Sequence, residues 1–221
     1  MIRRPAVPYI FPFAVFLGFL ALHSVFTVPD LTDQIVRVVV LTAVLLLVAR
    51  PVVDLHVHQA VRSILLGVLV FVVWIAPDLL IPGYRHHWLF ENPLTGSARP
   101  TLQSDTLHQP AALILRTLRA VAIVPIVEEL FWRGWLMRWL IAPDVRSVAL
   151  GTYSAQAFWV VAVLFASEHG SYWDVGLMAG VAYNWWMIRT RSLGDLILAH
   201  GVTNLCLSVY VIAAGKWEYW L

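Results

Sequence analysis

Long apolar runs alternate with short polar or turn-forming segments along almost the whole chain. A helix needs about 20 mostly apolar residues to cross a bilayer, and on that rule the pattern predicts about seven spans. The predicted spans lie near residues 9–28, 34–50, 60–81, 110–141, 150–169, 174–190 and 194–214. The pattern therefore predicts an all-α, polytopic transmembrane helix bundle.

The composition agrees with a membrane setting. Of the 221 residues, 60% are hydrophobic and only 13% are charged, and the mean hydropathy is +0.77. A soluble domain carries about 25% charged residues. The net charge is +2 and the basic residues are scattered, so the chain has no nucleic-acid-binding footprint. We expect an integral membrane protein with the lipid bilayer as its surroundings.

The distribution of Lys and Arg predicts the orientation. With a cytoplasmic N-terminus, eight basic residues lie on the inner side, four lie on the outer side, and three fall within the fourth segment. The positive-inside rule therefore favours a cytoplasmic N-terminus. The chain begins Met-Ile-Arg-Arg and turns apolar from Tyr9, as a signal peptide does, but no small-x-small cleavage site follows. We expect the first helix to be retained.

The organisation is simple, because the sequence shows no internal repeat and no low-complexity tract. We expect one membrane-embedded domain over residues 1–221. The one long polar segment, 82–109, is rich in turn formers and is expected outside the bilayer, where both a substrate-docking lid and a plain linker fit. The single cysteine, Cys206, excludes a disulfide within the chain and a Cys-built metal site.

Three ionisable residues interrupt the fourth apolar segment: Glu128, Glu129 and Arg133. At about 2.5–3.5 kcal/mol each near the bilayer centre, they would cost roughly 8–10 kcal/mol if deep and unpaired. Glu129 and Arg133 are four residues apart and share a helix face, which favours a salt bridge. Glu128 points about 100° away from Glu129 and lacks that partner, so it is the candidate general base. The alternative is a buried ion cluster that only fixes helix packing.

Two further polar groups interrupt later segments. Phe165 and His169 lie one turn apart at the end of the fifth predicted helix, and His169 can act as an acid, an electrophile or a metal ligand. His200 and Asn204 share a face of the last helix, where two donors can hold an oxyanion. Taken singly, an interfacial position at a helix end explains His169 better than a catalytic role does. Interhelical hydrogen bonding explains His200 and Asn204 as well as an oxyanion role does.

The three groups together form the series EExxxR, FxxxH and HxxxN, each on its own predicted helix. This series resembles the motifs of the CPBP (CAAX protease and bacteriocin-processing) family of intramembrane proteases, which includes the eukaryotic CAAX prenyl endopeptidase. The resemblance covers residues 110–210, the expected catalytic core. The chain also resembles compact members that work in bacterial C-terminal sorting systems, which would place it in a bacterial inner membrane.

The resemblance implies an intramembrane endopeptidase acting on a membrane-associated protein or peptide. Glu128 and His169 would activate a water molecule, and His200 and Asn204 would hold the oxyanion. Glu129, Arg133 and Phe165 would support the site. A glutamate-dependent site without a cofactor is favoured, because no HExxH helix is present and Arg133 would repel a cation. Zinc remains an alternative, with Glu128, His169 and His200 as its ligands.

Two other functions compete with the protease. A catalytically silent membrane scaffold or an immunity-type binding protein would keep the polar cluster for packing. A proton-coupled transporter would be expected to show internal symmetry or paired discontinuous helices, which the sequence lacks.

The protease hypothesis requires His169 and His200 to lie close together. The predicted topology puts His169 near the outer end of its helix and His200 near the inner end, so a short or tilted fifth helix or a bent fourth must bring them together.

Overall fold

A computed structural model describes residues 5–23, 29–99 and 109–220. The described residues are 76% helical and form no β-strand, which confirms the all-α fold class. The principal helices are α1 (Val7–His23), α2 (Asp30–Val44), α3 (Ala60–Leu80), α7 (Ala155–Ser167), α8 (Trp173–Thr190) and α9 (Leu193–Ala214). Between α3 and α7 lies one long helical rod, Pro110–Trp139.

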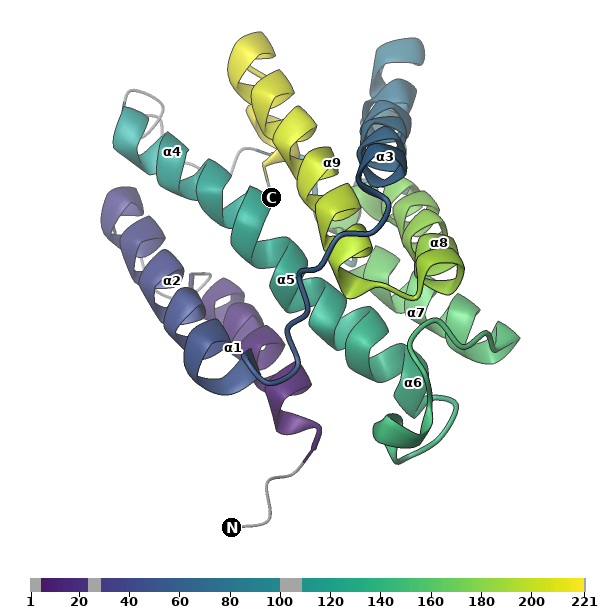
Figure 1. Ribbon diagram of the computed structural model, residues 1–221. Coiled ribbons are helices and arrows are strands. Elements are labelled where there is room, and N and C mark those ends of the chain that lie inside the picture. The colour runs from purple at the N-terminus through teal and green to yellow at the C-terminus, as the bar shows by residue number, and fades with distance from the viewer. Residues whose placement is uncertain (1–4, 24–28, 100–108, 221) are drawn as a thin grey trace.

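The rod consists of α4 (Pro110–Leu118), α5 (Val124–Glu129) and α6 (Met137–Trp139), joined by two π-helical stretches, Arg119–Ile123 and Leu130–Leu136. It crosses the middle of the molecule, with α1 and α2 on one side and α3, α7, α8 and α9 on the other (Figure 1). Among the helices, α9 packs most extensively on α3, and α7 on α8. The rod therefore carries its residues into the centre of the bundle.

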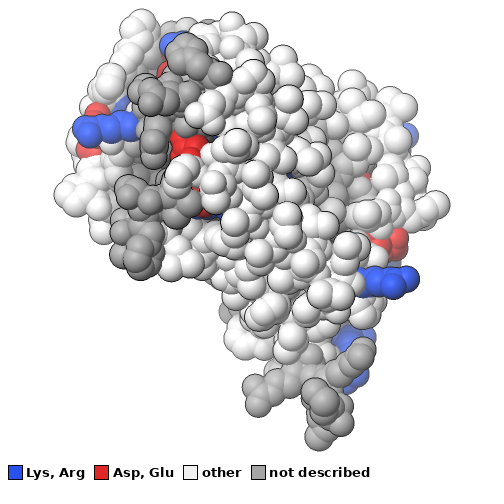
Figure 2. Space-filling model, turned by 90° about the vertical axis from the view of Figure 1, so that its left-hand side faces the viewer, with Lys and Arg blue, Asp and Glu red and all other residues white. Residues whose placement is uncertain are grey.

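Four helical segments of the described chain are long and apolar enough to cross a membrane: 30–49, 60–80, 110–139 and 193–214. The helices α1 and α7 are apolar but shorter. Large apolar side chains such as Leu47 and Leu80 point outward and are 83% and 77% exposed. Charged side chains are sparse on the face that Figure 2 shows. These features fit an integral membrane protein, because a bilayer would cover this apolar surface.

The first π-helical stretch has a local cause. Pro125 has no amide hydrogen to donate. The amide of Val124 bonds the carbonyl of Arg119, five residues earlier. The carbonyl of Ala120 would find Pro125 at the same spacing and so loses its intrahelical donor. The wider turn at Pro125 therefore leaves one backbone acceptor open on the side of the rod that faces α9.

Close packing of α9 depends on glycine. A Cβ atom added to Gly67 in α3 would overlap the carbonyl of Ala199, and one added to Gly201 would lie 2.9 Å from the carbonyl of Val121. The absence of these side chains lets the α9 backbone lie against both α3 and the rod. This approach sets the position of His200 and Asn204, which flank Gly201 in α9.

The described part of the predicted polar loop is anchored at the start of α8. Arg85 pairs with Asp78 and Asp174, and the indole of Trp173 donates to the carbonyl of Leu89 at 3.0 Å. None of residues 82–99 lines the cavity that Glu128, His169 and His200 share. Residues 100–108 of the loop lie outside the described residues, so the choice between lid and linker stays a prediction.

Candidate active site

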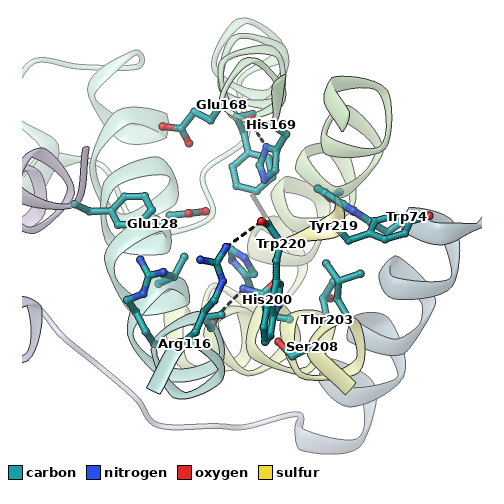
Figure 3. Close-up of a pocket in the computed structure, with 18 of the residues that line it drawn as sticks. Trp74, Arg116, Glu128, Glu168, His169, His200, Thr203, Ser208, Tyr219 and Trp220 are labelled. Atoms are coloured by element: carbon teal, nitrogen blue, oxygen red, sulfur yellow. Dashed lines mark hydrogen bonds between the residues drawn. The ribbon is translucent and has the colours of Figure 1, made fainter. Parts of the chain in front are cut away.

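A cavity of about 320 Å³ lies between the rod, α7, α9 and α3. Figure 3 shows Glu128, His169 and His200 reaching it from three different elements. Asn204 also lines it, so the four residues predicted to be catalytic share one cavity. Most of its other walls are apolar, including Phe16, Leu17, Leu20 and Leu207 in the part described.

Glu128 is a buried carboxylate that lacks a full set of partners. Its side chain is 7% exposed, and its Oε2 atom has no hydrogen-bond partner among the described residues. A buried unpaired polar atom costs about 1–3 kcal/mol, and more for a charged group. Glu128 also lines the cavity, so this incompletely partnered carboxylate lies beside space that a substrate could occupy.

Glu129 occupies the centre of a buried charge network. Arg133 donates from Nη1 to both carboxylate oxygens at 3.2 and 3.0 Å, which is the ion pair expected from the spacing. The Nδ1 atom of His200 donates to Oε1 of Glu129 at 2.8 Å. Both members of the ion pair are fully buried. This bond fixes the ring of His200 and leaves its Nε2 atom as the nitrogen available to the cavity.

Arg133 is held on its other side by α8. Its Nε donates to Oδ1 of Asn184 at 2.8 Å, and its Nη2 donates to the carbonyl of Gly180 at 3.3 Å. The guanidinium carbon lies 4.7 Å from the ring centroid of Phe165. The arginine thereby joins the rod to α7 and α8. Asn184 was not predicted from the sequence, because a lone asparagine in an apolar helix has no distinguishing pattern.

His169 follows the end of α7. Its Nδ1 donates to the carbonyl of Phe165 at 2.8 Å, since a carbonyl oxygen can only accept. In the neutral ring, Nε2 is then an acceptor. The rings of Phe165 and Trp74 lie 4.8 and 5.1 Å away between centroids and restrict its orientation. Phe165 thus contacts His169, as the predicted supporting role requires.

The short α7 lets His169 and His200 lie at the same cavity, as the proposed chemistry requires. The predicted fifth span, 150–169, is too long: Gly151 adopts a positive φ of 71°, and the helix begins only after Ser154. The Ser154 hydroxyl accepts from the amide of Ala157 and caps the helix. With 13 residues, α7 ends within the bundle, and His169 lines the same cavity as His200.

Asn204 donates a hydrogen bond to the backbone carbonyl that Pro125 leaves without an intrahelical donor. Its Nδ2 donates to the carbonyl of Ala120 at 2.8 Å. An amide nitrogen carries two hydrogens, so one remains for a ligand in the cavity. The π-helical stretch and the asparagine therefore form one unit.

The structure adds residues that the motifs did not include. The ring of Tyr183 stacks on that of His200, with 5.0 Å between the ring centroids. The Tyr183 hydroxyl donates to Oγ1 of Thr203 at 2.8 Å. Glu168 lines the cavity, as Figure 3 shows. Tyr219 and Trp220, after α9, form another part of its wall. Two arginines of the fourth segment, Arg116 and Arg119, also line it, and their charge in an apolar run was the available signal.

The alternative zinc site was tested against the geometry. Among the residues that the structure describes, no three His, Cys, Asp or Glu side chains come together closely enough to hold a metal ion. His169 and His200 each use Nδ1 in a hydrogen bond, so the Nε2 atom of each ring stays available. The zinc alternative stays a prediction.

One family model matches part of the chain. A family model described as Rce1-like, type II CAAX prenyl endopeptidase Rce1-like, matches residues 110–206. The predicted resemblance to the CPBP family is thus confirmed over that region, which contains all three motifs. The match supports an intramembrane protease of the CAAX type in general. Searches of curated proteins and of solved structures found no match.

Proposed function

We propose, on the premise that residues 110–206 match the Rce1-like family, that this chain hydrolyses a peptide bond of a membrane-associated protein or peptide. The observation that carries the proposal is the unpartnered Oε2 of Glu128 in a cavity that it shares with His169, His200 and Asn204. A carboxylate, a basic imidazole nitrogen and two further donors around one space are the groups that peptide hydrolysis needs.

In the proposed reaction, a water molecule bonds Oε2 of Glu128 and Nε2 of His169. Glu128 removes one proton while the water oxygen attacks the carbonyl carbon of the peptide. The protonated Glu128 then gives its proton to the departing amine nitrogen as the C–N bond breaks. The products are a new carboxyl group and a new amine, and Glu128 returns to its ionised form. No other reactant is required.

The tetrahedral intermediate carries a negative oxygen that needs donors. The second amide hydrogen of Asn204 supplies one donor and Nε2 of His200 the other. A ring that donates from both nitrogens carries both protons, and the carboxylate of Glu129 beside Nδ1 stabilises that positive charge. Arg133 keeps Glu129 in place from the opposite side. The buried network thus orients the donors rather than reacting itself.

The same arrangement supports a glutamate-dependent reaction without a bound metal. Glu129 is engaged by Arg133 and His200, whereas Glu128 keeps an acceptor without a partner. The walls of the cavity are mostly apolar. They therefore suit a substrate from the bilayer, in which apolar side chains flank the peptide bond.

The test uses the purified protein in lipid nanodiscs, incubated with a pool of synthetic apolar peptides in water enriched in ¹⁸O. Hydrolysis places one ¹⁸O atom in each new C-terminal carboxyl group, which mass spectrometry detects. We expect labelled products with the wild-type protein and none with Glu128→Gln. The control is Arg62→Gln, an exposed residue remote from the cavity, which should cleave normally. Labelled products at equal rates from Glu128→Gln would refute the proposed base, and no products from any variant would favour the silent scaffold.

A further inference from the structure

Two arginines line the same cavity at the end of the rod remote from Glu128. The rod residues in the wall are Arg116, Arg119, Ala120, Val124 and Glu128, which recur at the three- and four-residue spacing of one helix face. Two guanidinium groups and the candidate base therefore face one continuous space. The proposed reaction uses neither arginine, although charges at this depth are costly.

Arg119 lacks a partner of its own. Its side chain is 7% exposed, its Nε atom has no hydrogen-bond partner, and it forms no ion pair among the described residues. The charged groups around it are Arg116, Arg37 and Asp33. Asp33 is already bound by Arg37 at 2.7 Å. Arg119 is thus a buried guanidinium with two cationic neighbours and no available carboxylate. Binding of an anion would compensate its charge.

Arg116 already binds a backbone carbonyl within the cavity. Its Nη2 donates to the backbone carbonyl of Trp220 at 3.0 Å, a bond that Figure 3 draws, and its guanidinium lies 5.2 Å from the Trp220 ring. A segment of peptide main chain thus lies against this arginine inside the cavity. A substrate peptide in the same cavity would come within reach of its neighbour Arg119.

We infer that Arg119, beside Arg116, binds a carboxylate of the peptide substrate and so contributes to substrate selection. The inference rests on the proposed function, because it names a group of the substrate that the same cavity would recognise. Guanidinium and carboxylate form paired, charge-assisted hydrogen bonds. Arg119 therefore acts as a specificity-determining residue, and the peptide bond itself is left to Glu128 and His169.

The spacing limits where that carboxylate lies in the substrate. Nine residues separate Arg119 from Glu128, which is roughly 14 Å along the axis at about 1.5 Å per residue. An extended peptide covers this distance in about four residues. The carboxylate lies within about four residues of the cleaved bond. Both a free C-terminal carboxyl group and a Glu or Asp side chain meet this condition, and the experiment separates them.

The test measures binding in the Glu128→Gln background, so that cleavage does not disturb it. The probe is one fluorophore-labelled apolar octapeptide in four forms: free acid, C-terminal amide, amide with a terminal Glu, and amide with a terminal Gln. Fluorescence polarisation is read in nanodiscs of neutral lipid. We expect at least one carboxylate form to bind about tenfold or more tightly than its neutral counterpart. A preference limited to the free acid identifies the C-terminal carboxyl group, and one shared by the Glu form identifies any carboxylate.

The variants assign this preference to Arg119. Arg119→Gln should reduce the preference to less than about twofold, Arg119→Lys should keep part of it, and the exposed Arg62→Gln should keep all of it. Thermal unfolding of each variant verifies that it is folded. An unchanged preference in Arg119→Gln overturns the inference, as does equal binding of all four peptides in the parent protein. An Arg119 effect that depends only on added anionic lipid also overturns it and assigns the site to a lipid phosphate.

Failure of this inference can be distinguished from failure of the proposed function. A carboxylate preference that requires Arg119 supports the subsite even if the wild-type protein cleaves none of the peptides. Conversely, labelled cleavage products together with an unchanged preference in Arg119→Gln leave the protease in place and remove the subsite.

Discussion

Replacing Arg133 with methionine tests whether the buried network holds the site together. The substitution keeps most of the side-chain volume but removes the donors to Glu129, Asn184 and Gly180. It leaves the Glu129 carboxylate, which is fully buried, with His200 as its one remaining side-chain partner among the described residues. Removing one partner of a buried ion pair costs about 3–5 kcal/mol, mostly because the remaining charge is uncompensated.

The same reasoning predicts that a second substitution rescues the first. Glu129→Gln removes the uncompensated charge, and the amide oxygen of glutamine can still accept from Nδ1 of His200. The double variant should therefore be more stable than Arg133→Met alone. Additive losses would mean that the two residues do not act as a pair.

The assay is unfolding of the purified variants in one detergent, followed by tryptophan fluorescence, with peptide cleavage measured in parallel. Arg62→Met is the matched control, because Arg62 is exposed and should change stability by no more than about 0.5 kcal/mol. We expect Arg133→Met to unfold at a clearly lower temperature and to lose cleavage, because His200 loses its fixed orientation. Wild-type stability of Arg133→Met would refute the structural role assigned to the network.

Three further predictions concern the reaction. Asn204→Ala should fold but lose about 10²–10³-fold in kcat, as removal of one oxyanion donor does, and wild-type cleavage by this variant would contradict the role of Asn204. Gly201→Ala should also lower kcat, because its Cβ would lie 2.9 Å from the carbonyl of Val121 and push α9 from the rod; the same kcat as wild type, with equal expression, would contradict that tight approach. Treatment with a metal chelator should leave cleavage unchanged, whereas a loss that zinc reverses would support the zinc alternative with Glu128, His169 and His200.

The sequence predicted the parts of the site that depend on local helix geometry. The spacing of Glu129 and Arg133 indicated an ion pair, and that pair is present at 3.0 Å. The apolar runs indicated seven helical segments, and these are present in the described part of the chain, where four of them are long and apolar enough to span a membrane by themselves. Such features follow from periodicity within one segment, which a single sequence displays directly.

The remaining features depend on contacts between segments. The bond from His200 to Glu129 joins residues 71 positions apart, and the bond from Asn204 to Ala120 joins residues 84 apart. Neither bond has a local signal. The length of α7 was overestimated because hydropathy does not register the turn at Gly151 or the cap at Ser154, although both residue types are recognised helix-boundary signals. Those two residues could have shortened the predicted span.

The central claim, that Glu128 acts as the base of a peptidase, is tested most directly in the host cell. Membrane proteomes would be compared between cells expressing the wild-type protein and cells expressing Glu128→Gln at the same level, with protein C-termini identified by mass spectrometry. The account predicts that at least one uncut precursor accumulates only with Glu128→Gln. Identical C-termini in both, under conditions in which the protein is normally made, would contradict the account.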